Sequence, residues 1–168
     1  ELAEVPGLTA EPQRQHFDYV YRREDLAHLK GKRYHAKRNH INRIRRERIF
    51  EYRPIDRNLI EQCLNLADAW CGVRACEEDM SLTGELRAVR ELLANFEALD
   101  LVGGTICIQD KVEAFSVADR LNPQTGLVHV EKANPDIPEL YALINQQVSE
   151  HALTDIAWIN REQDLGEP

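Results

Sequence analysis

Polar side chains that could carry a proton or bind a substrate are concentrated in one short apolar stretch, residues 127–132. Strict alternation along a strand here places His129 and Glu131 on one face and Lys132 on the other. Imidazole titrates near neutral pH, so His129 could act as a general base that Glu131 or Glu162 orients, and Glu131 could itself take the proton. A purely structural histidine, and a Glu131 that only pairs with a neighbouring cation, are the alternative interpretations.

A second polar group follows the last predicted strand, residues 156–159. This apolar strand runs directly into Asn160, Arg161 and Glu162. Because ligands are commonly held at strand ends in sheets flanked by helices, we expect a substrate site here, with Glu162 assisting proton transfer. An ion pair between Arg161 and Glu162 that only supports the sheet is the alternative. The substrate-binding residues expected at the two strand ends are Lys132, Asn134, Asn160 and Arg161.

A strongly basic segment precedes these strands. Nine of the nineteen residues from Lys30 to Arg48 are Lys or Arg, and Glu47 is the only acid among them. Residues 1–54 hold 13 Lys and Arg against 8 Asp and Glu, whereas residues 55–168 hold 8 against 21. A chain polarised in this way usually meets phosphate or carboxylate groups with its positive face. The residues of this segment expected to bind substrate are Lys32, Lys37, Arg38, Asn39 and Asn42.

The basic segment is predicted to form a helix from about Lys32 to Glu47. Tyr34, Ile41 and Ile44 recur at helical spacing and give it a narrow apolar stripe. Two other interpretations of its charge stay open. The helix face could simply be solvated, or it could dock on the acidic remainder of the protein or on a partner domain.

The rest of the chain predicts a mixed α+β domain, an α/β-type sandwich. Its hydrophobic periodicity gives the order β-α-α-β-β-β-α-β behind the basic helix. The expected strands span residues 50–55, 105–108, 112–121, 127–132 and 156–159, and the expected helices span 59–71, 85–99 and 139–151. Asp56 is expected to cap the first of these helices. Residues 1–16 lack periodicity and are interpreted as a linker or a cut edge.

Several kinds of chemistry lack support in the sequence. It contains no phosphate-binding GxxxxGK[ST] loop, no GxGxxG, no HExxH and no GxSxG, so a metal-dependent or serine-nucleophile mechanism is not expected. The four cysteines form no CxxC pair and are interpreted as buried reduced thiols: Cys63, Cys71, Cys76 and Cys107. No apolar run approaches the roughly 20 residues of a membrane-spanning helix, and a cytoplasmic protein is expected.

Three sequence blocks carry a family resemblance. They are DYVYRREDLAHLKGKRYHAKRNHINRI, LVHVEKAN and INREQDLG. With these blocks the chain resembles the bacterial family of phosphatidylglycerol lysyltransferase C-terminal domains, from about Phe17 to the end. The resemblance implies a mixed sheet flanked by helices, of the GCN5-related N-acetyltransferase type. It also implies that residues 17–168 are the second domain of a tandem pair without its last strand, and that the first tandem domain is a missing partner.

The resemblance further implies an acyl- or aminoacyl-transferase that acts on an amine or hydroxyl acceptor. True lysyltransferases of the family take the aminoacyl group from tRNA, so aminoacyl-tRNA and acyl-CoA are the donors to consider, and no metal is expected. Where acetyl-CoA enzymes of this fold carry an [RQ]xxGx[GA] loop, residues 133–138 contain no glycine, which argues against ordinary use of CoA. A non-catalytic RNA- or phosphate-binding module and a CoA-dependent N-acetyltransferase are the alternatives.

Overall fold

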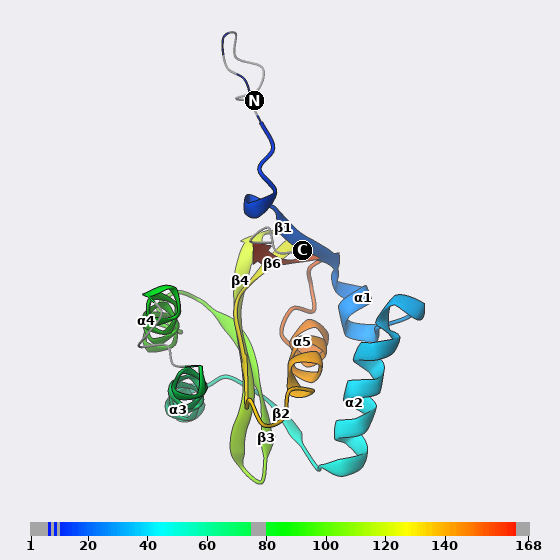
Figure 1. Ribbon diagram of the computed structural model, residues 1–168, viewed down its shortest axis with the longest axis vertical. Helices are drawn as coiled ribbons and strands as arrows, with labels where there is room; N and C mark the ends of the chain where they lie inside the picture. Colours follow the sequence, from blue (N-terminus) through cyan, green and yellow to red (C-terminus); the bar gives the residue numbers. More distant parts are fainter. Residues whose placement is uncertain (1–6, 8, 10, 75–79, 164–168) are drawn as a thin grey trace.

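The structure, a computed structural model, describes residues 7, 9, 11–74 and 80–163 of the 168-residue chain. Its centre is a mixed sheet with helices packed on both faces (Figure 1). The strand order is β1-β6-β5-β4-β3-β2, with β5 and β6 parallel and the other neighbours antiparallel. The strands are β1 (Asp18–Arg22), β2 (Glu51–Pro54), β3 (Val102–Ile108), β4 (Lys111–Asn122), β5 (Thr125–Ala133) and β6 (Trp158–Gln163).

The helices form one layer on one face of the sheet and two layers on the other (Figure 1). The helices are α1 (Arg23–His28), α2 (His35–Glu47), α3 (Arg57–Val73), α4 (Met80–Ala94) and α5 (Leu140–His151). α3 and α4 cover the first face, α5 covers the second, and α1 and α2 pack outside α5. Downstream of α2 the elements follow in the predicted order, so the α+β prediction of a mixed sheet flanked by helices is confirmed. The finer assignment to the GCN5-related type stays a prediction.

Two apolar cores hold these layers together. Ile41 and Ile44 of α2 pack with Ile144 of α5 on the second face, and Cys63 of α3 packs with Leu93 of α4 on the first. Each fully buried isoleucine or leucine side chain stabilises the fold by roughly 2 kcal/mol. The apolar stripe predicted for the basic segment is therefore what anchors α2 to the protein.

A local sequence signal accounts for the start of α3, whereas the starts of α2 and α4 differ from the prediction. Asp56 caps α3 as expected, because its carboxylate accepts hydrogen bonds from the backbone N–H groups of Asn58 (2.9 Å) and Leu59 (3.0 Å). The predicted helix over 32–47 is divided, since residues Lys32–Tyr34 form a 3-10 turn and α2 begins at His35. The predicted helix over 85–99 is in fact α4, which begins at Met80 and ends at Ala94.

The last strand differs most from expectation. β6 begins at Trp158 and includes Asn160, Arg161 and Glu162, which the side-chain pattern placed after the strand. The reason is backbone pairing with β1, in which Val20 lies opposite Asn160. Main-chain hydrogen bonds to a distant strand keep these polar residues extended, and a local hydrophobic pattern does not report such pairing.

The cysteines only partly follow the prediction. Cys63 and Cys107 are buried free thiols, and burial raises the pKa of Cys63 to about 12. Cys71 is disulfide-bonded, so the expectation of a reduced thiol is wrong there; disulfide formation depends on distance in the fold and needs no CxxC pattern. Cys76 lies outside the described residues. Within the described ranges, none of the helices has the length and apolarity to cross a bilayer.

Candidate functional site

A β-bulge in β5 decides where the candidate side chains point. Val128 and Val130 pair with consecutive residues of β4, so His129 between them has no cross-strand partner. Val128 belongs to the core on the α5 side and Val130 to the core on the α3/α4 side. The expectation that His129 and Glu131 share a face is therefore wrong, because one extra residue shifts the alternation between them.

His129 lies on the α3/α4 face, between two carboxylates. Its Nε2 is 3.3 Å from Oδ2 of Asp119 on β4, and its Nδ1 is 3.2 Å from Oε1 of Glu162 on β6. A neutral imidazole has one N–H and can donate to only one of them. The other carboxylate oxygen of Asp119, Oδ1, is buried without a hydrogen-bond partner among the described residues. The ring thus links three strands by contacts that depend on its protonation.

Glu162 has a backbone conformation that favours glycine. Its φ is 59°, in the left-handed region that costs a non-glycine residue roughly 1–2 kcal/mol. Its N–H donates to Oδ1 of Asn160 (2.8 Å), whose Nδ2 donates to Oδ2 of Asp18 on β1 (2.6 Å). Asn160, which is 6 % exposed, therefore supports Glu162 and joins β6 to β1.

Glu131 forms a separate polar cluster on the α5 face. One oxygen of its carboxylate accepts a hydrogen bond from Nδ2 of Asn145 on α5 (2.8 Å), and the other is paired with the guanidinium of Arg161 on β6. Nε of Arg161 is buried and has no partner in the described part of the chain. Lys37 of α2 lies close enough for the charges of Arg161 and Glu131 to act on its ammonium group. We call Lys37, Glu131, Asn145 and Arg161 the polar cluster.

Lys37 reaches this cluster because of its place on α2. It follows Tyr34 by three residues and precedes Ile41 by four, so it lies on the buried stripe of the helix. Burial, and next the positive charge of Arg161, lower the pKa of Lys37, while the negative charge of Glu131 acts in the opposite direction. The cluster thus brings together two cations, one carboxylate and one amide from α2, β5, α5 and β6.

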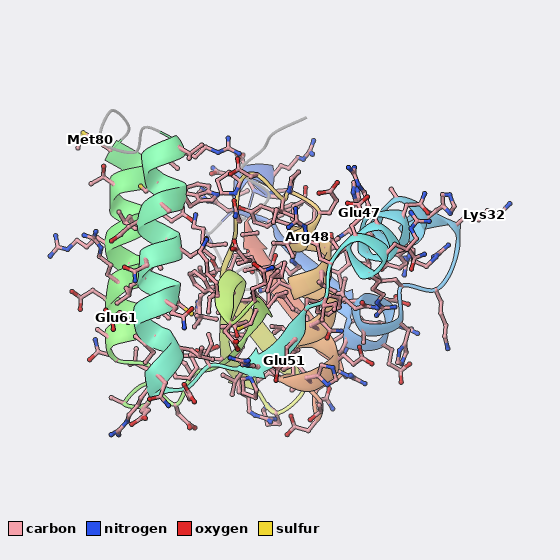
Figure 2. The ribbon with its side chains drawn as sticks, turned by 90° about the horizontal axis from the view of Figure 1, so that it is seen from below. Lys32, Glu47, Arg48, Glu51, Glu61 and Met80 are labelled. Carbon is pink, nitrogen blue, oxygen red and sulfur yellow. The ribbon has the colours of Figure 1, made fainter. Side chains whose placement is uncertain are left out.

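The other predicted residues of the basic segment lie elsewhere. Arg38 donates from Nη1 to the backbone oxygens of Leu29 and Gly31, which fixes the turn between α1 and α2. Lys32, Asn39 and Asn42 are exposed. Figure 2 shows α2 and the α3–α4 pair at opposite sides of the molecule, with Lys32 at the outer end. Arg43, which was not predicted, pairs with Glu139 just before α5 (2.9 Å). Of the five expected residues, only Lys37 joins the polar cluster.

Lys132 and Asn134 make contacts of a structural kind. Nζ of Lys132 is 2.7 Å from Oε1 of Glu85 on α4 and 3.4 Å from the ring centroid of Trp70 on α3, and Lys132 is only 5 % exposed. Nδ2 of Asn134 donates to Glu113 of β4 (2.6 Å). Neither side chain points toward the polar cluster across the sheet.

The sheet opens beside the polar cluster. β5 pairs with β6 only over Thr125–Leu127, and no further pair joins these two strands in the described ranges. Nε1 of Trp70 on α3 donates to the hydroxyl of Tyr141 on α5 (2.8 Å), although these helices cover opposite faces. Because the Trp70 ring also contacts Lys132 of β5, this hydrogen bond lies near the part of β5 that does not pair with β6. Glu131 and Arg161 lie on the two strands that border this opening.

A cavity in the structure does not coincide with the polar contacts described above. A cavity of about 500 Å³ lies between α3 and α4, lined by residues that include Leu64 and Phe96, and it touches neither His129 nor the polar cluster. Its lining is largely apolar or solvent-exposed, and it offers no convergent catalytic groups. We therefore base the candidate site on the charged groups at the sheet opening. Among the described residues, His, Cys, Asp and Glu side chains form no group of three that could hold a metal ion.

Sequence reasoning missed Asn145 and Asp119. Asn145 is 3 % exposed between the apolar residues Ile144 and Val148 of α5, so a polar residue on a core-facing stripe was the available signal. Asp119 directly follows the buried apolar residues Val117 and Ala118 of β4, which was the corresponding signal there. Lys37 was predicted as a substrate ligand, but the sequence did not distinguish it from its exposed neighbours.

Comparisons with known proteins agree with this architecture. The sequence model described as "Phosphatidylglycerol lysyltransferase, C-terminal" matches residues 2–167. A conserved protein of unknown function from Bacteroides thetaiotaomicron VPI-5482 has 44% sequence identity and a TM-score of 0.87, and the match covers 92% of this chain and 53% of that chain. A comparison with curated proteins gave no match.

Two solved structures share the fold at low identity. The C-terminal domain assigned to a lysylphosphatidylglycerol synthetase of Agrobacterium fabrum has 11% identity and a TM-score of 0.58, and L-PGS from Bacillus licheniformis has 10% and 0.57. Each match covers 89% of this chain and 46% of the other, so the chain spans about half the length of these proteins. From the match over residues 2–167, we conclude that the chain belongs to the family of phosphatidylglycerol lysyltransferase C-terminal domains.

Proposed function

We propose that this protein transfers an aminoacyl or acyl group from a phosphate-bearing donor to an amine or hydroxyl acceptor. The observation that carries the proposal is the polar cluster at the divergence of β5 and β6, in a chain of this family. Acyl transfer needs a cation or N–H donor beside the carbonyl oxygen, where negative charge develops in the transition state. Arg161, held in place by Glu131 and left with an unpaired Nε in the described part of the chain, is suited to that role.

The loop after β5 supports a donor other than CoA. The N–H groups that would have to surround a pyrophosphate are already engaged: those of Asn134, Asp136 and Ile137 donate to Glu113 O (2.8 Å), Asn134 Oδ1 (2.9 Å) and Asn134 O (3.0 Å). Binding a pyrophosphate there would break these hydrogen bonds. An aminoacyl ester of RNA, which needs no such loop, fits better, with exposed cations of α2 such as Arg45 and Arg46 holding its phosphates.

The alternative function is a non-catalytic module that binds RNA or another polyanion. One observation favours it: three of the five Lys and Arg residues of α2, namely Arg43, Arg45 and Arg46, are exposed. In that case the charge of α2 alone determines binding, and the polar cluster only stabilises the fold. His129 and Glu162, which we predicted to assist catalysis, would likewise be structural.

A transfer assay with the full natural chain tests the proposal. Labelled aminoacyl-tRNAs and acyl-CoA are offered separately, with phosphatidylglycerol vesicles or soluble amines as acceptors. We expect transfer from aminoacyl-tRNA and a loss of about 100-fold or more in kcat for Arg161→Ala. Arg90→Ala is the matched control, because Arg90 forms an exposed pair with Asp68 on the far face. Absence of transfer from every donor would overturn the proposed function.

A further inference from the structure

We propose that Lys37 is the general base of this acyl transfer, and that its neutral amine takes the proton of the attacking acceptor. The inference rests on the proposed function and assigns a role that the contacts of the polar cluster leave open. It makes a lysine, and not His129, the group that moves the proton.

Lys37 lies on the side of α2 that packs against the rest of the protein. Tyr34, Ile41 and Ile44 on the same stripe of α2 are 5 %, 2 % and 2 % exposed, so the stripe faces the interior, and Lys37 beside them is partly buried. A lysine that served only for solubility would lie on the outer faces of α2, as Arg45 and Arg46 do. Lys37 instead lies near enough to Glu131 and Arg161 for their charges to act on its ammonium group.

The other candidate bases, Glu131 and His129, already have hydrogen-bonding or charged partners. Both carboxylate oxygens of Glu131 already accept hydrogen bonds, from Asn145 and Arg161. His129 lies on the opposite face of the sheet with a carboxylate at each ring nitrogen. Lys37, by contrast, forms no ion pair within 4.0 Å among the described residues, although it lies in the field of Glu131 and Arg161. Its amine is thus available to a substrate.

The electrostatic surroundings point in the same direction. The charged groups that face Lys37 are Arg161 of β6 and Glu131 of β5. Burial and the charge of Arg161 lower the pKa of Lys37, and Glu131 opposes them with the smallest of the three effects. A lysine pushed toward its neutral form is a better proton acceptor near neutral pH than one on the surface, which is how lysines become catalytic bases.

The proton balance of the step is complete within the site. The acceptor's oxygen or nitrogen attacks the ester carbonyl carbon of the donor, and its proton passes to Nζ of Lys37 as the new bond forms. The oxyanion that results faces Arg161. When the bond from the carbonyl carbon to the donor's oxygen breaks, the Lys37 ammonium returns the proton to that oxygen. No oxidant, metal or second co-reactant is needed.

The decisive comparison is Lys37→Arg against Lys37→Ala. Arginine keeps the positive charge but stays protonated, so it preserves donor binding and removes the base. We expect kcat of Lys37→Arg to fall about 100-fold with little change in the KM of the donor, and methylamine to restore activity to Lys37→Ala. In the wild type kcat/KM should rise with pH, because the base must lose its proton before it can act. The pH profile of Lys37→Ala should lack this rise. Lys30→Arg, an exposed change in the same segment, is the control.

Wild-type kcat in Lys37→Arg would overturn the assignment while leaving the proposed function intact. A readout without turnover separates the two further: after reductive ¹³C-methylation of the lysines, the NMR signal absent from Lys37→Arg identifies Lys37. We expect that signal to titrate below the ordinary lysine range, which lies near 10.4. Titration at the ordinary value would refute the inference whatever the transfer assay gives. Absence of transfer by the wild type would overturn both the proposed function and this inference.

Discussion

At the scale of single residues, one bulged position in β5 divides the candidate polar residues between the two faces of the sheet. Because His129 is the extra residue of β5, it contacts Asp119 and Glu162 on one face, whereas Glu131 contacts Asn145 and Arg161 on the other. The residue types of the candidate site could be found from the sequence, since polar groups stood out in apolar strands. Their faces could not, because a bulge depends on how β4 and β5 pair and leaves no mark in local periodicity.

Asn145 gives a residue-scale prediction about stability. Asn145→Ala removes the donor to Glu131 and leaves a buried carboxylate oxygen less well satisfied. We expect the free energy of unfolding to fall by about 1–3 kcal/mol, measured by urea denaturation. Asn42→Ala, at an exposed position of α2, is the control and should change it by less than about 0.5 kcal/mol. Equal effects of the two substitutions would show that the hydrogen bond between Asn145 and Glu131 does not contribute.

Tyr52 gives a prediction about pH. Burial raises the pKa of Tyr52 to about 12, above the ordinary value near 10. The folded chain then holds the phenolic proton more tightly than the unfolded chain, so this contribution is complete below about pH 10 and is lost as the pH rises toward 12.

Over that interval the wild type should therefore lose about 1–2 kcal/mol more stability than Tyr52→Phe, after allowance for the partly exposed ring. Urea unfolding of both proteins at several alkaline pH values measures the difference. Parallel curves would show that the Tyr52 phenol has an ordinary pKa in the folded protein.

At the scale of elements, the parts with a broad apolar stripe and a local start signal were predictable. α3 is the best example, with Asp56 as its cap and one face in the core. β6 is the opposite case, because its polar residues stay in the strand through pairing with β1, more than 130 residues earlier in the chain. The start of α4 and the division of the basic helix were missed because propensity and periodicity define helix ends poorly.

A pair of glycines tests the packing of two elements. A Cβ on Gly104 of β3 would lie 2.2 Å from Cε2 of Tyr52, whereas a Cβ on Gly84 of α4 would meet nothing within 4 Å. We expect Gly104→Ala to lower the free energy of unfolding by about 1–3 kcal/mol through the clash, and Gly84→Ala to raise it by about 0.5–1 kcal/mol through helix propensity. Thermal and urea unfolding measure both. A neutral Gly104→Ala would mean that the Tyr52 ring moves away at little cost.

At the scale of the whole molecule, charge is separated between two sides. The basic helix α2 lies on the opposite side of the protein from α3 and α4, and the remainder is acidic (Figure 2). The charge asymmetry was evident in the sequence, and so was the apolar stripe that anchors α2. Which of the cations face inward was not, because that depends on how α2 lies against α5 and on the strands beyond it.

This separation predicts salt-dependent binding of polyanions through α2. The variant Arg45→Ala/Arg46→Ala should bind tRNA more weakly, and the slope of log K against log salt should become less steep by about one for each phosphate that the protein no longer neutralises. Filter binding at several salt concentrations measures this. The control is Arg57→Ala/Arg90→Ala, which removes two cations from the α3/α4 side. Equally weakened binding by the two variants would mean that α2 is not the binding surface.

The hydrogen bond between Trp70 and Tyr141 has a mechanical consequence for the opening in the sheet. It links α3 and α5, which otherwise lie on opposite faces of the sheet. A ligand that moves β5 and β6 further apart on that side would stretch this hydrogen bond and separate the Trp70 indole from the Lys132 ammonium. In a Trp158→Phe variant, in which Trp70 is the remaining tryptophan, its fluorescence emission would then report whether a substrate widens the opening or binds without widening it.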